Sequence, residues 1–113
     1  AWSGSARLGA PLPDAPMLSR NGQPIWLLEA LGGEETLIHV PNGAAAPVGK
    51  RVLVIGHDLV DAEGLFAQRF DTTPGSTYLV RPDQHLAARW RHATPPLVEC
   101  ASRRLRGFEG GHA

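Results

Sequence analysis

The sequence contains a single cysteine, Cys100, among its 113 residues. One thiol excludes an internal disulfide framework, a CxxC redox pair and a zinc site built from several cysteines. The glycines never fall in a GxGxxG or GxxxxGK[ST] pattern, so no dinucleotide or phosphate cradle is indicated. No apolar run approaches the roughly 20 residues that span a bilayer, and no signal-peptide pattern opens the chain. We therefore expect a cytoplasmic protein with no membrane partner.

The sequence also lacks an excess of either charge. Lys plus Arg and Asp plus Glu number 11 each, which gives a formal net charge of zero. This balance removes the long-range attraction typical of nucleic-acid binding, so we expect no nucleic-acid partner. The length and the 42% hydrophobic content suit one domain with one core. The chain starts at Ala1 without an initiator Met, which we interpret as processing or excision from a larger protein.

Composition divides the chain into three parts. Residues 1–16 form an extended N-terminal segment whose prolines disfavour helix, residues 17–107 form the folded domain, and residues 108–113 form a tail. The Asn21-Gly22 dipeptide predicts a tight turn. A short helix is predicted over 25–31, with an apolar side made of Ile25, Leu28 and Leu31.

The rest of the domain shows strand and helix patterns. Strands are predicted over 36–40, 51–56, 77–81 and 85–90, and helices over 63–70 and 94–107. The continuous apolar run in 51–56 indicates a central strand that is covered on both faces and parallel to its neighbour. Clean alternation in 85–90 places Leu86, Ala88 and Trp90 on one face of a half-exposed strand.

This order of elements is typical of a thioredoxin-like α/β fold. It predicts a central mixed four-stranded sheet, made of a parallel pair plus an antiparallel hairpin, with flanking helices. A loop over 41–50 replaces the first crossover helix, and Pro41–Ala46 occupies the place of the redox cysteines without any sulfur. We expect Cys100, on the last helix, to be a small buried hydrophobe. A Cys100 open to water beside a basic residue would contradict the interpretation of the domain as a scaffold without redox chemistry.

Other polar groups show weak patterns. The five histidines have no HxH or HxxxH spacing, which argues against a metal site: His39, His57, His85, His92 and His112. His57, Asp58 and Asp61 follow a strand end where α/β sheets often bind ligands, although Asp61 also suits a helix cap. A third group could bind an anion but is more simply a solvated face: Arg89, Arg91, Arg103, Arg104 and Arg106. We assign no catalytic, cofactor-binding or metal residue.

Three segments resemble FAD-dependent aromatic-ring hydroxylases, the class A flavoprotein monooxygenases such as phenol hydroxylase and 3-(3-hydroxyphenyl)propionate hydroxylase. Residues 77–90, TYLVRPDQHLAARW, are similar to the family hairpin LVRPDGHVAWR. Residues 7–16, RLGAPLPDAP, resemble its R-x-G-x-R-x-P-D-x-P segment, and residues 21–32 resemble its short L-x-x-L-L-G helix. Gln84 replaces the family glycine and would have to adopt a positive φ. Pro74 lies where thioredoxin-like folds place a cis-proline, but we expect a trans bond.

The resemblance implies a C-terminal thioredoxin-like domain without redox cysteines. Such a domain packs on the FAD and substrate domains of its parent and contributes to subunit contacts, for which a homodimer is the expected form. FAD and NAD(P)H would belong to the parent, and this chain would hold no cofactor. Exposed aromatic residues would mark the contact surfaces, with candidates Trp2, Trp26, Trp90 and Phe108. The alternatives are a stand-alone thioredoxin- or peroxiredoxin-like redox protein using Cys100, or a small-ligand domain using the loop from His57 to Asp61.

Overall fold

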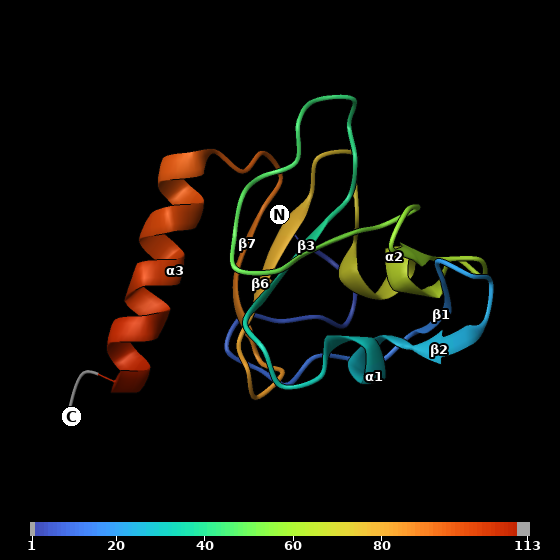
Figure 1. Ribbon diagram of the computed structural model, residues 1–113, viewed down its shortest axis with the longest axis horizontal. Helices are drawn as coiled ribbons and strands as arrows, with labels where there is room; N and C mark the ends of the chain where they lie inside the picture. The colour runs from blue at the N-terminus through green and yellow to red at the C-terminus, as the bar shows by residue number, and fades with distance from the viewer. Residues whose placement is uncertain (1, 111–113) are drawn as a thin grey trace.

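The computed structural model describes residues 2–110, and side chains as far as Gly107. Its centre is a four-stranded sheet of order β4-β3-β6-β7, made of Val52–Val54, Thr36–His39, Thr77–Val80 and Leu86–Trp90. β3 and β4 are parallel, and the other two pairs are antiparallel. Helix α3 (Pro95–Gly110) covers one face, while the other elements lie on the opposite side (Figure 1). This arrangement confirms the predicted mixed sheet.

A second sheet of three short strands was not predicted. β1 (Pro16–Ser19) pairs antiparallel with β2 (Pro24–Trp26) and with β5 (Leu59–Val60). The Asn-Gly turn joins β1 to β2, with Gly22 at φ +81° and the Ser19 N–H bonded to the Gln23 carbonyl at 2.8 Å. The turn prediction is correct, but the chain continues from it as a hairpin strand.

The predicted helix over 25–31 is therefore wrong at its start. Ile25 lies in β2, and α1 spans only Leu27–Leu31. Its fully buried side chains are Leu27 and Leu31, four residues apart. Of the predicted apolar side, Leu31 is fully buried, and Ile25 and Leu28 are half-buried against the core. The hairpin partner β1 overrides the local helical preference of this segment.

The central strands are β3 and β6, in which all four residues are buried. β4 was predicted to be central but lies at the sheet edge, with three half-buried residues. Its parallel pairing with β3 is as predicted. The continuous apolar run of β4 reflects packing against both core clusters, through Leu53 on one side and Val52 on the other.

A β-bulge interrupts the β6–β7 hairpin, so the predicted alternation of β7 is also wrong. Val80 pairs with Leu86, but Leu79 pairs with Ala88, which leaves Ala87 as the extra residue. Leu86 consequently packs in the larger core cluster, whereas Ala88 and Trp90 pack in the smaller cluster beneath α3.

Gln84 closes this hairpin at φ +64°, as its replacement of glycine predicted. Its side-chain amide donates to the carbonyls of Leu28, at 2.7 Å, and Gly32, at 3.0 Å. These bonds tie the hairpin turn to α1 and offset the strain of a left-handed backbone at a residue with a side chain. The bond before Pro74 is trans.

The extended N-terminal segment is part of the core. Three of its own residues, Ala6, Leu12 and Ala15, are buried. The N–H groups of Ser5 and Ala6 donate to the Arg69 carbonyl at 2.9 and 3.0 Å, and the Leu12 N–H donates to the Gln84 carbonyl at 2.9 Å. The segment thus closes one side of the larger core cluster.

Two helices complete the fold. α2 (Leu65–Phe70) begins where Asp61 accepts hydrogen bonds from the N–H groups of Phe66 and Ala67, which confirms the predicted capping role of Asp61. The Phe70 carbonyl accepts a hydrogen bond of 2.8 Å from the Tyr78 hydroxyl, and burial raises the pKa of Tyr78 to about 12.

α3 continues past Gly107, its predicted end, to Gly110. None of the described helices is both long and apolar enough to cross a membrane.

Gly75 provides a test of how tightly the end of the sheet is packed. Its φ is +94°, and a Cβ there would lie 3.1 Å from the Arg91 carbonyl oxygen and 2.9 Å from the Asn42 amide nitrogen. Gly22 has a similar φ of +81° with open space around it. We expect Gly22→Ala to cost about 1 kcal/mol of unfolding free energy and Gly75→Ala at least about 2 kcal/mol. Urea denaturation measures both values, and equal losses would contradict the close approach.

Candidate functional site

The end of β3 is where the thioredoxin-like order places its redox pair. The chain here leaves the sheet as an exposed loop, 41–46, rather than as a helix. A cavity of about 230 Å³ lies against this loop, and four alanines, Pro47, His39 and His92 are among the residues that line it. The cavity lining holds no sulfur and no permanently charged side chain. The position therefore has no group for thiol exchange.

His39 is the polar residue inside this region and is 5% exposed. Its Nδ1 lies 2.9 Å from the Thr77 hydroxyl, which itself donates to the Gly75 carbonyl at 3.2 Å. Because the hydroxyl proton is already used, the Thr77 oxygen accepts from Nδ1–H, and Nε2 carries the lone pair. Nε2 is buried and has no partner among the described atoms. Burial lowers the pKa of His39, so the ring is neutral near pH 7.

The other histidines do not join His39 in a metal site. His92 lines the same cavity but is exposed, and His57 and His85 lie beside Asp58 and Asp83 elsewhere. Within residues 2–107, no three side chains of the His, Cys, Asp and Glu types come together as metal ligands would. His112 lies outside the described residues.

The prediction that Cys100 is buried is wrong. Cys100 is exposed on α3, and its sulfur lies 3.8 Å from the Arg104 guanidinium. The sequence pattern of this helix also predicts a buried stripe of Leu97, Val98, Ala101 and Leu105, which is incorrect in part because Leu97 is 48% exposed. The stripe that faces the sheet consists of Val98, Ser102 and Leu105, with Ala101 at its margin. Cys100 lies on the far side of the helix from that stripe, so its thiol meets the solvent.

The segment from His57 to Asp61 is predicted as a loop, but Leu59–Val60 within it form β5, and hydrogen bonds to neighbouring residues hold the segment in place. Asp58 accepts from the Val54 N–H at 2.8 Å and pairs with Arg20. Partial burial raises the pKa of Asp58, but the Val54 hydrogen bond and Arg20 outweigh it, so the net pKa is lowered. None of the described cavities is lined by His57, Asp58 or Asp61. These groups fix a turn and the start of α2.

The five predicted arginines separate into two groups. Arg89 and Arg91 hold the N-terminal segment: their guanidinium carbons lie 4.6 and 3.7 Å from the Trp2 ring centroid. Arg91 also pairs with Asp71 at 2.6 Å. A hydrogen bond from the Ser3 N–H, together with Arg91, lowers the pKa of Asp71. The other three arginines lie on α3, on the other side of the sheet.

The exposure of the candidate aromatic residues is mixed. Trp26 is 53% exposed at the edge of the small sheet, as predicted. Trp2 is half-buried between the two arginines, and Trp90 is half-buried against the smaller core cluster. The side chain of Phe108 lies outside the described residues. Other exposed apolar side chains, without aromatic rings, are Leu8, Val48, Val60 and Leu97.

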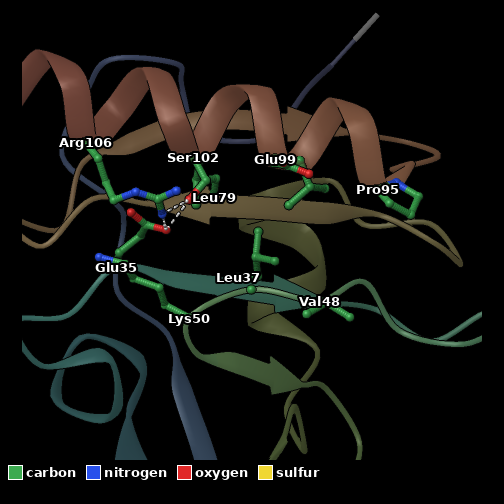
Figure 2. A pocket seen from close by; sticks show the side chains of 11 residues that line it. Glu35, Leu37, Val48, Lys50, Leu79, Pro95, Glu99, Ser102 and Arg106 are labelled. Atoms are coloured by element: carbon green, nitrogen blue, oxygen red, sulfur yellow. Dashed lines mark hydrogen bonds and ion pairs between the residues drawn. The ribbon is translucent and has the colours of Figure 1, made fainter.

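A polar cluster joins α3 to the sheet, and the sequence did not suggest it. Glu35 and Ser102 in this cluster are buried, whereas the side chain of Arg106 is 44% exposed. Glu35, whose side chain is 8% exposed, accepts a hydrogen bond from the Ser102 hydroxyl (Figure 2). Arg106 donates to the Ser102 oxygen at 2.9 Å and lies 3.6 Å from the Glu35 carboxylate. We call these three residues the α3 clasp. A cavity of about 250 Å³ lies beside it, between α3 and β3.

Comparisons with known proteins were made with both the sequence and the structure. No protein-family model and no curated protein matches the sequence. Solved structures do match: the flavin-dependent monooxygenase PieE, in complex with FAD and substrate, has a TM-score of 0.72 at 26% identity over 92% of this chain. Aklavinone-11 hydroxylase, in a ternary complex with FAD and aklavinone, has a TM-score of 0.69 at 25% identity over 91%. This chain spans only 21% of each of those chains.

A third match concerns the fold alone. PrxQ from Xylella fastidiosa, a peroxiredoxin crystallised as a cysteine-to-serine mutant, has a TM-score of 0.58 at 12% identity. The match covers 98% of this chain and all of that one. The thioredoxin-like fold class is thereby confirmed. The chain is similar both to a whole peroxiredoxin fold and to a small part of larger FAD-dependent monooxygenases.

The α3 clasp predicts that two glutamates near α3 contribute unequally to the free energy of unfolding. Glu35→Gln removes a buried charge that faces Arg106, and we expect a loss of about 1–3 kcal/mol in unfolding free energy. Glu99→Gln removes an exposed pair with Arg103 one turn apart on the helix, which we expect to cost less than about 0.5 kcal/mol. Urea denaturation of both variants makes the comparison, and equal effects would show that the clasp does not hold α3.

His39 predicts a specific dependence of stability on pH. Its pKa is lowered in the folded state, so the unfolded chain binds a proton more readily below about pH 6.5. The contribution of His39 to the free energy of unfolding is complete above that pH. It is lost as the pH falls toward the folded-state pKa, by up to about 1.4 kcal/mol per pH unit. In His39→Phe, which has no titrating ring at this position, the urea midpoint should change less with pH between about pH 7.5 and about pH 5 than in the wild type. The exposed His57→Gln control should leave the slope unchanged; a wild-type slope in His39→Phe would contradict the assignment.

Proposed function

We propose that this chain is the non-catalytic C-terminal domain of an FAD- and NAD(P)H-dependent aromatic hydroxylase. The observation that carries the proposal is the match to two FAD-dependent monooxygenases over more than nine-tenths of this chain and about one-fifth of theirs. The hairpin of residues 77–90 and the N-terminal segment of residues 7–16, which resemble the family, both contribute to the core, through Leu86 and Leu12. The parent would hydroxylate a phenolic ring, with the flavin and O2 chemistry located in its other domains.

The residues of this chain do not fit FAD. The largest of the described cavities is about 280 Å³, below the roughly 300–1,000 Å³ of typical cofactor sites. No glycine-rich turn is present to hold a pyrophosphate. The role that remains is structural: packing against the FAD and substrate domains, and contact with a second subunit in a cytoplasmic homodimer. Of the aromatic side chains that the structure describes, Trp26, on the edge strand of the small sheet, is the most exposed and so the most available for such contacts.

The redox alternative is supported by one observation, the exposed Cys100 beside Arg104. A neighbouring guanidinium favours a thiolate and so favours reactivity. Against it, the thiol lies on the outer face of the last helix and the chain has no second cysteine to resolve a disulfide. The end of β3, where the fold would present a reactive group, holds a neutral imidazole and no thiol.

The proposal predicts that the purified 113-residue chain is catalytically silent. Prepared with excess FAD and then desalted, it should retain no flavin absorbance. With NADH or NADPH, added FAD and a phenol, it should oxidise no more nucleotide than a protein-free control, because none of the described cavities has the size of a typical flavin site. Retained flavin, or oxidation above the control, would overturn the assignment.

Thiol titration separates the proposal from its redox alternative. The reaction rate of Cys100 with a disulfide reagent is followed against pH, with Cys100→Ser as the blank and Arg104→Gln as the test of the neighbouring charge. The structural role predicts a slow reaction at about pH 6 whose rate is the same in the wild type and in Arg104→Gln. A fast reaction that persists at about pH 6 and is lost in Arg104→Gln would favour the redox protein.

A further inference from the structure

A shallow groove runs between α3 and β7, on the side of the helix opposite the clasp cavity. Its volume is about 280 Å³. It is lined by two arginines, Arg81 and Arg104, and by six small or apolar residues: Gly9, Leu86, Ala87, Ala88, Ala101 and Leu105. Three of these are alanines at the helix–sheet contact, and their short side chains leave the space open.

The β-bulge shapes the floor of this groove. Because Ala87 is the extra residue, Ala87 and Ala88 both contact the cluster beneath α3, where regular alternation would turn one of them away. Leu86 and Leu105 are buried below and beside them. The floor is therefore continuous and apolar, and it fits a short aliphatic or aromatic group.

The groove differs from the neighbouring cavities in charge. The clasp cavity contains Lys50 and Arg106 but also Glu35 and Glu99, and the cavity at the end of β3 contains no permanent charge. Among the residues whose side chains are described, the groove is lined by two guanidinium groups and no carboxylate. Its charge is positive, next to an apolar floor.

The two arginines are incompletely paired. Arg104 has the Cys100 sulfur as a neighbour at 3.8 Å, and within the part of the chain whose side chains are described no carboxylate pairs with it. Arg81 pairs through Nη2 with Asp83 at 2.6 Å, but its Nε–H is buried and has no acceptor in the same part of the chain. A guanidinium beside apolar surface favours a carboxylate, which can accept two parallel N–H bonds.

We propose that this groove binds a small amphipathic carboxylate. Arg104 and Arg81 would hold the carboxylate, and the alkyl or aryl part would lie on the alanine and leucine floor. The inference uses only groups of this chain and stands whether or not the proposed function is correct. It predicts that affinity requires both the charge and the apolar part of the ligand.

Chemical-shift titration of the ¹⁵N-labelled chain tests the ligand class with three probes. Hexanoate should shift the amides of 86–88 and 101–105 in a saturable manner. Acetate, which lacks the chain, and hexanol, which lacks the charge, should each bind at least about ten-fold more weakly. Acetate binding as strongly as hexanoate would show a site for a bare carboxylate, such as an acidic side chain of another domain, and would overturn the proposal. Saturation by hexanol at the hexanoate concentration would overturn it equally.

Paired variants test the site. Arg104→Gln should weaken hexanoate binding by about three- to ten-fold, whereas Arg103→Gln, which removes the same charge from the neighbouring outward position, should change it by less than about two-fold. Both residues are exposed, so both variants should keep the amide spectrum of the folded chain. Equal losses in the two variants would indicate only a general attraction to the basic helix and would contradict a defined groove.

Discussion

β3 and β6 must be covered on both faces, because every residue in these two strands is buried. In a thioredoxin-like order the helix that follows the first strand supplies part of that cover. Here the chain forms a loop after β3, so the apolar surface must be buried by other segments. The positions of the remaining elements follow from this requirement.

One face is covered by an assembly of short pieces. α1, α2, the small sheet and the N-terminal segment all contribute to the cluster around Ile38, Tyr78 and Val80. None of these pieces is long enough to be stable alone, and polar contacts join them: Gln84 to α1, Asp61 to α2, and Arg89 and Arg91 to Trp2. This explains why the segment before β1 belongs to the core.

The other face is covered by a single helix, α3, through a narrow stripe centred on Val98 and Leu105. The contact is thin, with a cavity on one side of the stripe and a groove on the other. The clasp at Glu35 fixes the helix where apolar contact is limited. The solvent-facing side of α3 carries Cys100 and Leu97, which is where a partner domain would find accessible surface.

Local patterns predicted the four strands of the central sheet, with one parallel pair and one antiparallel hairpin, because β-branched and apolar runs such as Thr36–His39 leave little choice of structure. They did not predict that β4 lies at the sheet edge. These patterns gave wrong predictions where contacts with residues distant in the sequence determine the local structure. The pairing of Ile25 with Met17 turned a helical pattern into a strand, and the bulge at Ala87 has no local signal. The predicted burial of Cys100 was wrong because Ser102 occupies the buried stripe of α3. Ser102 is held there by Glu35, 67 residues away in the sequence, and a polar residue at a buried position made the buried face of the helix hard to predict. The clasp and the groove arise from such long-range contacts and could not be predicted.

The central claim is that this thioredoxin-like scaffold supports a flavoenzyme instead of performing redox chemistry itself. Sequencing the reading frame upstream of the codon for Ala1 tests it most directly. The account predicts one continuous frame that encodes a GxGxxG segment for FAD and a substrate domain before Ala1. A stop codon in that frame with a start codon close to Ala1, and hence a free-standing protein of this length, would contradict it.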